Sequence, residues 1–271
     1  MGIVNVTPDS FADGGLHAQA SAAIARCEQL VREGADILDI GGESTRPGAD
    51  DVGAANELAR VLPVLREAVK LGVPVSADTS EPRVMHEALA LGADIVNDVR
   101  SLRRPGALSL LARHPRAGVC LMHMRGEPAS MQSDTHYDDC VAEVGRFLHD
   151  RARELEQAGI QRERVVIDPG IGFAKLASHN LALLARQEEL LSLPWPLLVG
   201  WSRKGTLGHV TGRPVQQRLA GSIAAALAAV QRGAAIVRVH DVAETVDALK
   251  IWLAAGLPGA GHTDKREGFT A

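Results

Sequence analysis

The sequence predicts an α/β protein with a (β/α)8 barrel, the TIM-barrel fold, formed as a single domain over residues 1–271. Eight short runs of aliphatic residues alternate with longer amphipathic stretches, a pattern typical of a parallel sheet covered by helices. The chain length suits a barrel of eight βα units. Polar motifs follow the aliphatic runs, where the loops of a barrel build its active site. An open, doubly wound sheet is the alternative fold.

The expected strands and helices follow from residue periodicity and turn signals. Aliphatic and β-branched runs predict strands over residues 2–6, 36–40, 73–77, 94–97, 118–122, 165–167, 197–200 and 235–239. Amphipathic spacing predicts helices over residues 18–33, 54–70, 137–157, 181–191, 215–231 and 242–254. Glycine tolerates the left-handed conformation in which helices often end, and a glycine stands shortly before four of the expected strands.

The composition excludes several classes of protein. Hydrophobic residues make up 46% of the chain and charged residues 23%, enough apolar material for a substantial core. A net charge of −4 and an aromatic content of 3% argue against a surface that binds nucleic acid. No signal peptide is visible, and no apolar run reaches the roughly 18 residues that span a membrane. Cys27, Cys120 and Cys140 lack CxxC spacing, so neither a disulfide framework nor a zinc site is expected, and a reducing cytoplasm fits best.

Each expected strand is closed or followed by polar residues. In chain order these are Asn5, residues 43–46, Asp78, residues 97–98, His123, Asp168, residues 202–204 and His240. The C-terminal ends of barrel strands share one mouth, so these side chains are expected to converge there. The sequence has no HExxH, P-loop, strand-linked GxGxxG or Gly-x-Ser-x-Gly motif, so common hydrolase, kinase and dehydrogenase functions lose support.

Asp78, Asn97 and Asp168 come from three different strand ends and together suit a heterocyclic ligand. A carboxylate accepts two parallel N–H bonds, while an amide both donates and accepts. Such groups match a ring that carries an amino group, a ring N–H and a carbonyl. Each residue alone is also a good helix N-cap, and the residues after Asp78 suit a cap.

Arg238 and His240 are spaced so that both side chains point to one face of a strand. Phosphate sites in barrels often lie near strands seven and eight, so this pair is expected to bind an anion; a structural role for the histidine is the alternative. Arg203 and Lys204 either hold an anion or a heterocycle carbonyl, or lie on the surface. The amide of Asn5 either ligates a metal or a phosphate oxygen, or belongs to the turn after it.

Two further loops carry candidates. Arg46 lies in a loop bracketed by glycines, and its guanidinium either meets anionic oxygens or is solvated. Phe173 lies in the turn over residues 168–175 and either walls a pocket for an aromatic substrate or belongs to the core.

The ordered motifs over residues 5–11, 42–49, 78–79, 97–98, 122–124, 168–173, 202–204 and 238–242 resemble those of the dihydropteroate synthases, a pterin-binding family. The resemblance covers nearly the whole chain, and its specificity lies in the number and order of the motifs. It implies a (β/α)8 barrel that acts in folate synthesis. The implied reaction joins 6-hydroxymethyl-7,8-dihydropterin diphosphate to p-aminobenzoate and gives 7,8-dihydropteroate and pyrophosphate.

The resemblance implies a role for each matched residue. Pterin binding would use Asp78, Asn97, Asp168 and Lys204. Diphosphate binding would use Asn5, Arg238 and His240, with Mg2+ as the cofactor and Asn5 as its ligand. The p-aminobenzoate pocket and its mobile loops would use Phe11, Thr45, Arg46, Pro47, Phe173, Ser202 and Arg203. The catalytic set would be Lys204, Asp78, Asp168, Arg238 and His240.

The resemblance also implies how the chain works in the cell. Its partners would be the two small-molecule substrates and a second copy in a homodimer, with no nucleic acid and no membrane. A cytoplasmic location is implied. Sulfonamides resemble p-aminobenzoate and are expected to inhibit.

The chain departs from the family pattern at three places. Gly205 stands where the family has a serine that would contact the p-aminobenzoate carboxylate, Ala174 stands where a glycine is common, and Met1 begins the first strand without the usual short leader. A pterin-binding paralogue with altered catalysis is therefore one alternative. Others are a methyltetrahydrofolate–corrinoid methyltransferase, which needs no diphosphate pocket, and a barrel for a phosphorylated sugar, which leaves the carboxylates and amide unexplained.

Overall fold

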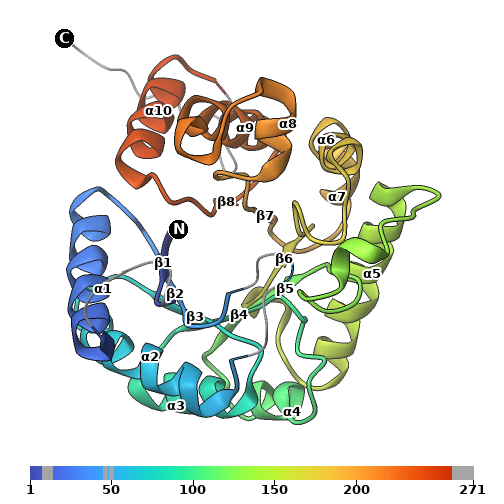
Figure 1. The fold of residues 1–271 in the computed structure, drawn as a ribbon. Helices are drawn as coiled ribbons and strands as arrows, with labels where there is room; N and C mark the ends of the chain where they lie inside the picture. Colours follow the sequence, from blue (N-terminus) through green and yellow to red (C-terminus); the bar gives the residue numbers. More distant parts are fainter. Residues whose placement is uncertain (8–14, 45–47, 49–51, 258–271) are drawn as a thin grey trace.

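In the computed structural model, which describes residues 1–7, 15–44, 48 and 52–257, eight strands alternate with helices (Figure 1). The strands are β1 (Gly2–Asn5), β2 (Leu38–Gly41), β3 (Val75–Asp78), β4 (Ile95–Asp98), β5 (Gly118–Met122), β6 (Val165–Asp168), β7 (Leu198–Val199) and β8 (Ile236–Val237). β1 to β6 form one sheet in chain order, and β7 pairs with β8. All these strand pairs are parallel, as the alternation with helices predicts.

Backbone hydrogen bonds at two seams close these two sheets into a ring. At the β6–β7 seam, the amide of Ile167 donates to the carbonyl of Pro196 at 3.0 Å. At the β8–β1 seam, the amide of Ile3 donates to the carbonyl of Val239 at 3.0 Å, and the amide of Val239 donates to the carbonyl of Met1 at 2.9 Å. Figure 1 shows the strands around a common centre with the helices outside, so the predicted (β/α)8 barrel is confirmed.

The helices cover the outside of the ring. They are α1 (Gly15–Arg32), α2 (Ala54–Ala68), α3 (Pro82–Leu91), α4 (Ala107–Ala112), α5 (Cys140–Gln157), α6 (Ala177–Ala185), α7 (Gln187–Leu190), α8 (Gly205–Thr211), α9 (Leu219–Gln231) and α10 (Val242–Ala254). The short helix α8 is inserted between β7 and α9, directly after the Ser-Arg-Lys motif. None of the described helices is long and apolar enough to cross a membrane.

Several predicted helices differ from the structure for local reasons. The helix predicted over residues 215–231 begins only at Leu219, because Val215–Gln217 form a separate 3-10 turn. The helix predicted over residues 181–191 is divided between α6 and α7, because the backbone of Arg186 (φ −108°, ψ 22°) leaves the helical region. The helix predicted over residues 137–157 begins only at Cys140. The side chain of Asp139 caps it there by accepting hydrogen bonds from two backbone amides.

The core lies between the sheet and the helices, with a smaller cluster inside the ring. Two large groups of buried aliphatic side chains pack the helices against the strands. Met1, Cys120 and Leu198 come from opposite parts of the barrel and pack together, so their cluster fills the interior. The barrel is therefore a packed core rather than a pore, and open space is left at its mouth.

Candidate active site

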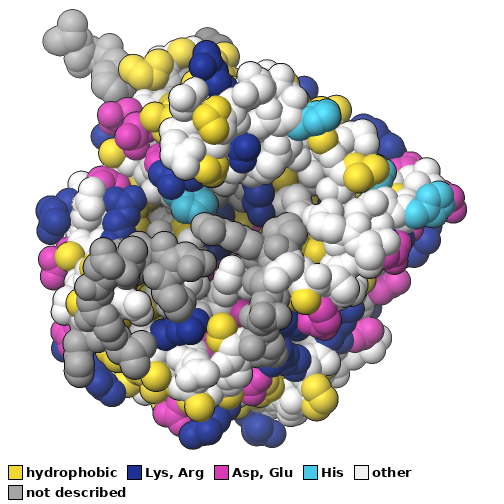
Figure 2. Space-filling view, in the orientation of Figure 1, with side chains coloured by type: hydrophobic (Ala, Val, Ile, Leu, Met, Phe, Trp, Pro, Cys, Tyr) yellow, Lys and Arg dark blue, Asp and Glu magenta, His cyan; other side chains and the backbone are white. Residues whose placement is uncertain are grey.

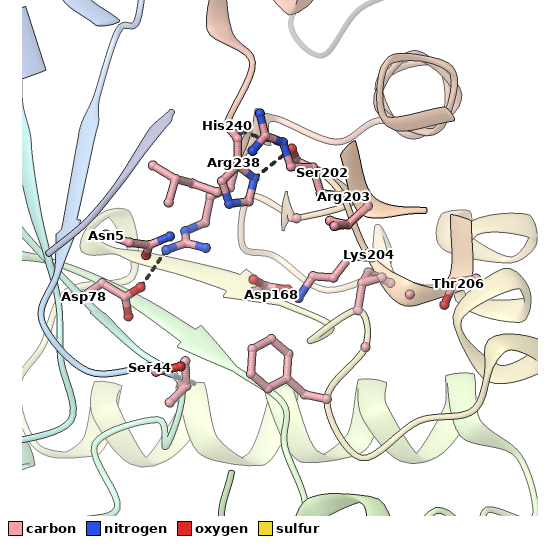
Figure 3. Close-up of a pocket in the computed structure, with 18 of the residues that line it drawn as sticks. Asn5, Ser44, Asp78, Asp168, Ser202, Arg203, Lys204, Thr206, Arg238 and His240 are labelled. Atoms are coloured by element: carbon pink, nitrogen blue, oxygen red, sulfur yellow. Dashed lines mark hydrogen bonds and ion pairs between the residues drawn. The ribbon is translucent and has the colours of Figure 1, made fainter. Parts of the chain in front are cut away.

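A cavity of about 1360 Å3 opens at the C-terminal ends of the strands. Its lining includes Asn5, Asp78, Asn97, Asp168, Lys204, Arg238 and His240. Figure 2 shows Lys, Arg and His side chains gathered around a hollow in the middle of this face. Figure 3 shows Asn5 and Asp78 beside Arg238, and Asp168 beside Lys204, in the cavity. The structure therefore brings the polar strand ends together, as a barrel requires.

Arg238 bridges two carboxylates on the floor of this cavity. Its Nε donates to Asp39 Oδ2 at 2.5 Å, and its Nη2 donates to Asp78 Oδ2 at 2.6 Å. Asn97 Nδ2 also donates to Asp39 Oδ2, at 3.2 Å. We call these four residues the Arg238 cluster. A Cβ at Gly41, beside Asp78 in the sheet, would lie 3.2 Å from the Cβ of Asp78, so glycine leaves the room that this carboxylate needs.

Burial sets the protonation of the charged groups in the cavity. It raises the pKa of Asp78 to about 7, although Arg238 acts in the opposite direction. Burial also raises the pKa of Asp168, whose Oδ1 accepts a hydrogen bond from the amide of Gly170 at 2.7 Å. The pKa of Lys204 falls to about 8 because of burial and the nearby Arg238. Burial disfavours the charge of Arg238, but Asp39 and Asp78 raise its pKa above the ordinary value.

Lys204 and Phe173 meet across the cavity. The Nζ of Lys204 lies 4.3 Å from the centre of the Phe173 ring, which is within the range of a cation–π contact. Phe173 lines the cavity on one side and packs against a buried group that contains three methionines on the other. Gly172, at φ +83°, lies below Lys204; a Cβ there would be 3.2 Å from Lys204 Cδ.

The loop between β6 and α6 is held from below by two buried side chains. Asn180 Oδ1 accepts a hydrogen bond from the amide of Gly172 at 2.8 Å, and its Nδ2 donates to Thr206 Oγ1 at 2.9 Å. The Nζ of Lys175 lies 2.9 Å from His123 Nδ1 and donates to the carbonyl of Phe173 at 3.0 Å. Burial lowers the pKa of Lys175 to about 7. Sequence reasoning assigned no role to Lys175 or Asn180.

His240 and Ser202 form a pair at the rim. Ser202 Oγ accepts a hydrogen bond from the backbone amide of His240 at 3.1 Å and lies 2.9 Å from His240 Nδ1. Burial lowers the pKa of His240 to about 3, and Arg203 and Arg238 act in the same direction. Arg203 itself pairs with Asp241, with 3.1 Å between Nε and Oδ2. The imidazole is therefore neutral at pH 7, and Arg203 already has an anionic partner.

Asn5 ends β1 and lines the cavity next to the Arg238 cluster. Figure 3 shows its amide beside Arg238 and above Asp78. No group of three or more His, Cys, Asp or Glu side chains able to hold a metal ion occurs in the described part of the chain. The predicted loop residues Phe11, Thr45, Arg46 and Pro47 lie outside the described residues.

Sequence reasoning also missed Asp39 and Arg100, which are both buried. Asp39 is fully buried within the aliphatic strand β2, and a lone carboxylate in such a run was the available signal. Arg100 follows β4 and forms two ion pairs. Its Nη1 lies 3.1 Å from Glu43 Oε2, and its Nε lies 2.5 Å from Glu127 Oε2. No local pattern links Arg100 to these glutamates, because both come from other loops. Their contacts connect the second, fourth and fifth loops of the mouth.

An eight-stranded barrel whose mouth joins carboxylates, an amide and cations in one cavity is suited to an anionic heterocyclic substrate. Comparisons with known proteins define the class further. Residues 1–240 match the family model described as pterin binding enzyme. Dihydropteroate synthase from Neisseria meningitidis serogroup B is 54% identical over 263 residues, which cover 95% of this chain and 92% of that relative.

Solved structures agree with the sequence relatives. Dihydropteroate synthase from Xanthomonas albilineans with 4-aminobenzoic acid matches with a TM-score of 0.89 and 53% identity, over 94% of this chain and 92% of that one. The same enzyme in complex with 7,8-dihydropteroate matches with a TM-score of 0.86 and 50% identity, over the same shares. The chain therefore belongs to the pterin-binding enzyme family and, within it, to the dihydropteroate synthases, which are transferases of folate biosynthesis.

Proposed function

We propose that this chain condenses 6-hydroxymethyl-7,8-dihydropterin diphosphate with p-aminobenzoate, giving 7,8-dihydropteroate and pyrophosphate. The observation that carries the proposal is the single cavity that holds Asp78, Asn97 and Asp168 together with Lys204 and Arg238. It pairs groups for a pterin edge with cations for a diphosphate. The related structures that hold 4-aminobenzoic acid and 7,8-dihydropteroate support both the amine substrate and the product.

The pterin binds on the floor of the cavity in this proposal. Asp78 and Asp168 accept hydrogen bonds from its amino group and ring N–H groups, because a carboxylate can accept two parallel N–H bonds. Asn97 accepts a further N–H, and Lys204 donates to the ring carbonyl. Arg238 has to share or release Asp78 when the pterin enters, since its Nη2 lies 2.6 Å from that carboxylate in the structure.

The diphosphate binds between Arg238, His240 and Asn5. His240 acts as a neutral N–H donor when the hydroxyl of Ser202 donates to Nδ1, because the ring proton is then on Nε2. The amide oxygen of Asn5 is a hard ligand that fits Mg2+, which commonly takes its other oxygens from phosphates and water. Bound Mg2+ supplies positive charge to the leaving pyrophosphate.

The chemistry requires positioning and charge stabilisation more than a strong base. The bond between the pterin methylene and the diphosphate oxygen breaks, and its electrons leave with pyrophosphate. The neutral aromatic amine forms the new N–C bond to the methylene and then loses one proton to solvent. Arg238 and Lys204 stabilise the charge that develops, while the electron-rich pterin supports the methylene cation.

The amine pocket lies at the side of the cavity formed by Phe173 and Ser202 in this proposal. Phe11, Thr45, Arg46 and Pro47 are assigned to it by their motif positions, with Arg203 at the rim. A Cβ at Gly205 would meet no atom within 4 Å, so the pocket has open space where the family has a serine. The ring of p-aminobenzoate can stack on Phe173 beside Lys204.

We also propose that two copies associate through the outer faces of α8, α9 and α10, which lie together in Figure 1. These helices expose large apolar side chains, among them Val210 (60% exposed), Leu219 (38%) and Ile251 (73%). A cytoplasmic location fits the three cysteines, which are buried free thiols.

The test is an assay of the purified chain with the pterin diphosphate, p-aminobenzoate and Mg2+, following pyrophosphate and dihydropteroate separately. Equal amounts of both products are expected, and a sulfonamide should compete with p-aminobenzoate. Tight pterin binding without turnover would instead identify a paralogue with altered catalysis. Pyrophosphate release without dihydropteroate would contradict the assigned amine pocket.

A further inference from the structure

Asp39 contacts no ligand in the proposed function, yet it lies at the centre of the Arg238 cluster. The residue is fully buried in β2. Its Oδ2 accepts hydrogen bonds from Arg238 and from Asn97, while its Oδ1 has no hydrogen-bond partner among the described residues. Burying a carboxylate is costly unless a cation compensates it, and Arg238 is the cation that contacts it.

The same guanidinium serves two groups that the ligand requires. In the structure, Nη2 of Arg238 donates a hydrogen bond to Asp78, the carboxylate proposed to bind the pterin. The proposed diphosphate also binds Arg238. Each half of the substrate therefore competes with the Arg238–Asp78 contact. The contact between Nε and Asp39 involves neither half and can persist throughout.

We infer that Asp39 is a positioning residue: it holds Arg238 by Nε while the Nη groups pass from Asp78 to the diphosphate. This inference rests on the proposed function and deepens it. A guanidinium has donors on separate edges, so one edge can stay on Asp39 while the other turns to the ligand. Asp39 thereby keeps the Arg238 guanidinium on the cavity floor after Asp78 has exchanged its contact with Arg238 for hydrogen bonds to the pterin.

Asp39 also orients the amide of Asn97. The hydrogen bond from Nδ2 to Asp39 fixes which end of the amide carries the nitrogen. The amide oxygen makes no hydrogen bond to any described residue and is free to accept an N–H from the pterin. One buried carboxylate thus sets the orientation of two ligand-binding side chains that come from β4 and from the end of β8.

The shared ion pair couples the two halves of the ligand. Whichever half binds first opens the Arg238–Asp78 contact, and the other half then meets a site that is already open. Pyrophosphate should therefore tighten the binding of the pterin alcohol, and the pterin alcohol should tighten the binding of pyrophosphate by the same factor. Without the charge of Asp39, Asp78 would be the only carboxylate paired with Arg238 in the cluster. The Arg238–Asp78 ion pair would then be stronger, and a ligand would open it less easily.

The experiment is calorimetry with 6-hydroxymethyl-7,8-dihydropterin in the absence and presence of Mg2+ and pyrophosphate. In the wild type, pyrophosphate should lower the Kd of the pterin about fivefold or more. Asp39→Asn keeps the shape and one acceptor oxygen but removes the charge. It should weaken pterin binding about tenfold and make the effect of pyrophosphate larger than in the wild type.

Two variants complete the design. Arg238→Gln removes the cation while Asp39 stays intact, so pyrophosphate should no longer change the Kd of the pterin. Asp94→Asn is the matched control, because Asp94 precedes β4 at the opposite end of the barrel and accepts a hydrogen bond from the amide of Val75. It should behave as the wild type in both titrations.

The inference is overturned if pyrophosphate does not change the Kd of the pterin in the wild type. It is also overturned if Asp39→Asn folds and shows the same pterin Kd, and the same effect of pyrophosphate on it, as the wild type. Should Asp39→Asn fail to fold, the comparison of the wild type with Arg238→Gln still decides, since equal coupling in both overturns the inference. Turnover separates this result from the proposed function. An active wild type without coupling removes only the role of Asp39, whereas a chain that converts no substrate removes the function as well.

Discussion

Arg238 and His240 lie two residues apart after β8 and would offer a bound anion different chemistry. The carboxylates around Arg238 keep its guanidinium charged. The pKa of His240 falls to about 3 through burial and the neighbouring Arg203 and Arg238, so its imidazole is neutral between pH 6 and 8. At residue scale the proposed diphosphate corner therefore combines one fixed charge with one neutral donor.

His240→Ala should weaken pyrophosphate binding about ten- to hundredfold, because a hydrogen bond to a charged group contributes about 1.5–3 kcal/mol. The pterin alcohol should keep its Kd within about twofold. Because the imidazole is already neutral at pH 6, the variant and the wild type should show the same pH dependence of pyrophosphate binding from pH 6 to 8. Calorimetry at several pH values measures both.

His136→Ala is the control for this change, since His136 is an exposed histidine outside the cavity lining. It should bind both ligands as the wild type does. A pH-dependent step near 6.5 that disappears in His240→Ala would show that a charged imidazole binds the anion, contrary to this prediction.

Glu57 is a buried carboxyl group on α2 that makes stability depend on pH. Burial raises its pKa from 4.5 to about 7, although a hydrogen bond with Thr79 acts in the opposite direction. Its Oε1 has no partner among the described residues. Because its pKa is higher in the folded state, the unfolded chain loses the proton first, and the protein loses stability as the pH rises from about 4.5 to about 7.

Glu57→Gln should therefore match the wild type in unfolding free energy near pH 4 and exceed it at pH 8. A shift from 4.5 to about 7 corresponds to a difference on the order of 2–4 kcal/mol at pH 8. Urea unfolding at the two pH values tests this. Glu67→Gln, an exposed change on the same helix, should show no comparable gain; a gain of the same size there would remove the role of burial.

At the scale of elements, the mouth depends on loops that are tied to one another below the cavity. Asn180 on α6 joins the β6–α6 loop to α8 through Gly172 and Thr206. The loop it holds carries Phe173, and α8 begins next to Lys204. Asn180 is therefore placed to hold Phe173 and Lys204 at the spacing of their cation–π contact.

Asn180→Ala should raise the KM for p-aminobenzoate severalfold while changing the Kd of the pterin alcohol less. It leaves the amide of Gly172 and the hydroxyl of Thr206 without this partner, so the unfolding free energy should fall by about 1–3 kcal/mol. Steady-state kinetics and urea unfolding measure the two effects. Asn56→Ala, at an exposed asparagine on α2, is the control; an unchanged KM in Asn180→Ala would refute the positioning of the loop.

The sequence predicts elements better than it predicts their contacts. Strand positions follow from aliphatic runs, and Asp78 and Asp168 were assigned to the mouth because each closes such a run. The pairing of Arg238 with Asp39 joins residues 199 positions apart, which no local pattern specifies. Asp39 was missed because it lies within a run that was interpreted only as a strand.

At the scale of the whole molecule, the alternation of strands and helices, the chain length and the polar strand ends together favour the barrel over an open sheet. It does not specify how the ring closes, because the two seams use a few backbone hydrogen bonds next to β7 and β8, which are only two residues long each. The short helix α8 was also missed, since its seven residues are too few for a periodic signal.

The exposed apolar face of α8, α9 and α10 leads to a prediction about assembly. Ile251→Glu should convert the proposed dimer into a monomer, because a charge at the centre of an apolar interface is costly to bury. Light scattering after size-exclusion chromatography measures the mass. Lys250→Glu, at the neighbouring exposed position, should leave the mass unchanged. A wild type that is monomeric at micromolar concentration would refute the proposed interface.

The Arg238 cluster also crosses the β8–β1 seam, since Arg238 follows β8 while Asp39 and Asp78 belong to the six-stranded sheet. A diphosphate that draws Arg238 away from Asp78 would break one contact between the six-stranded sheet and the β7–β8 pair. By binding Arg238 and Asn5 together, it would form a new contact between the same two parts of the barrel. The bound substrate would then help to hold the two sheets of the barrel together. We therefore expect bound diphosphate to slow the opening of the ring at this seam, and slower hydrogen exchange of the Ile3 and Val239 amides in its presence would measure the effect.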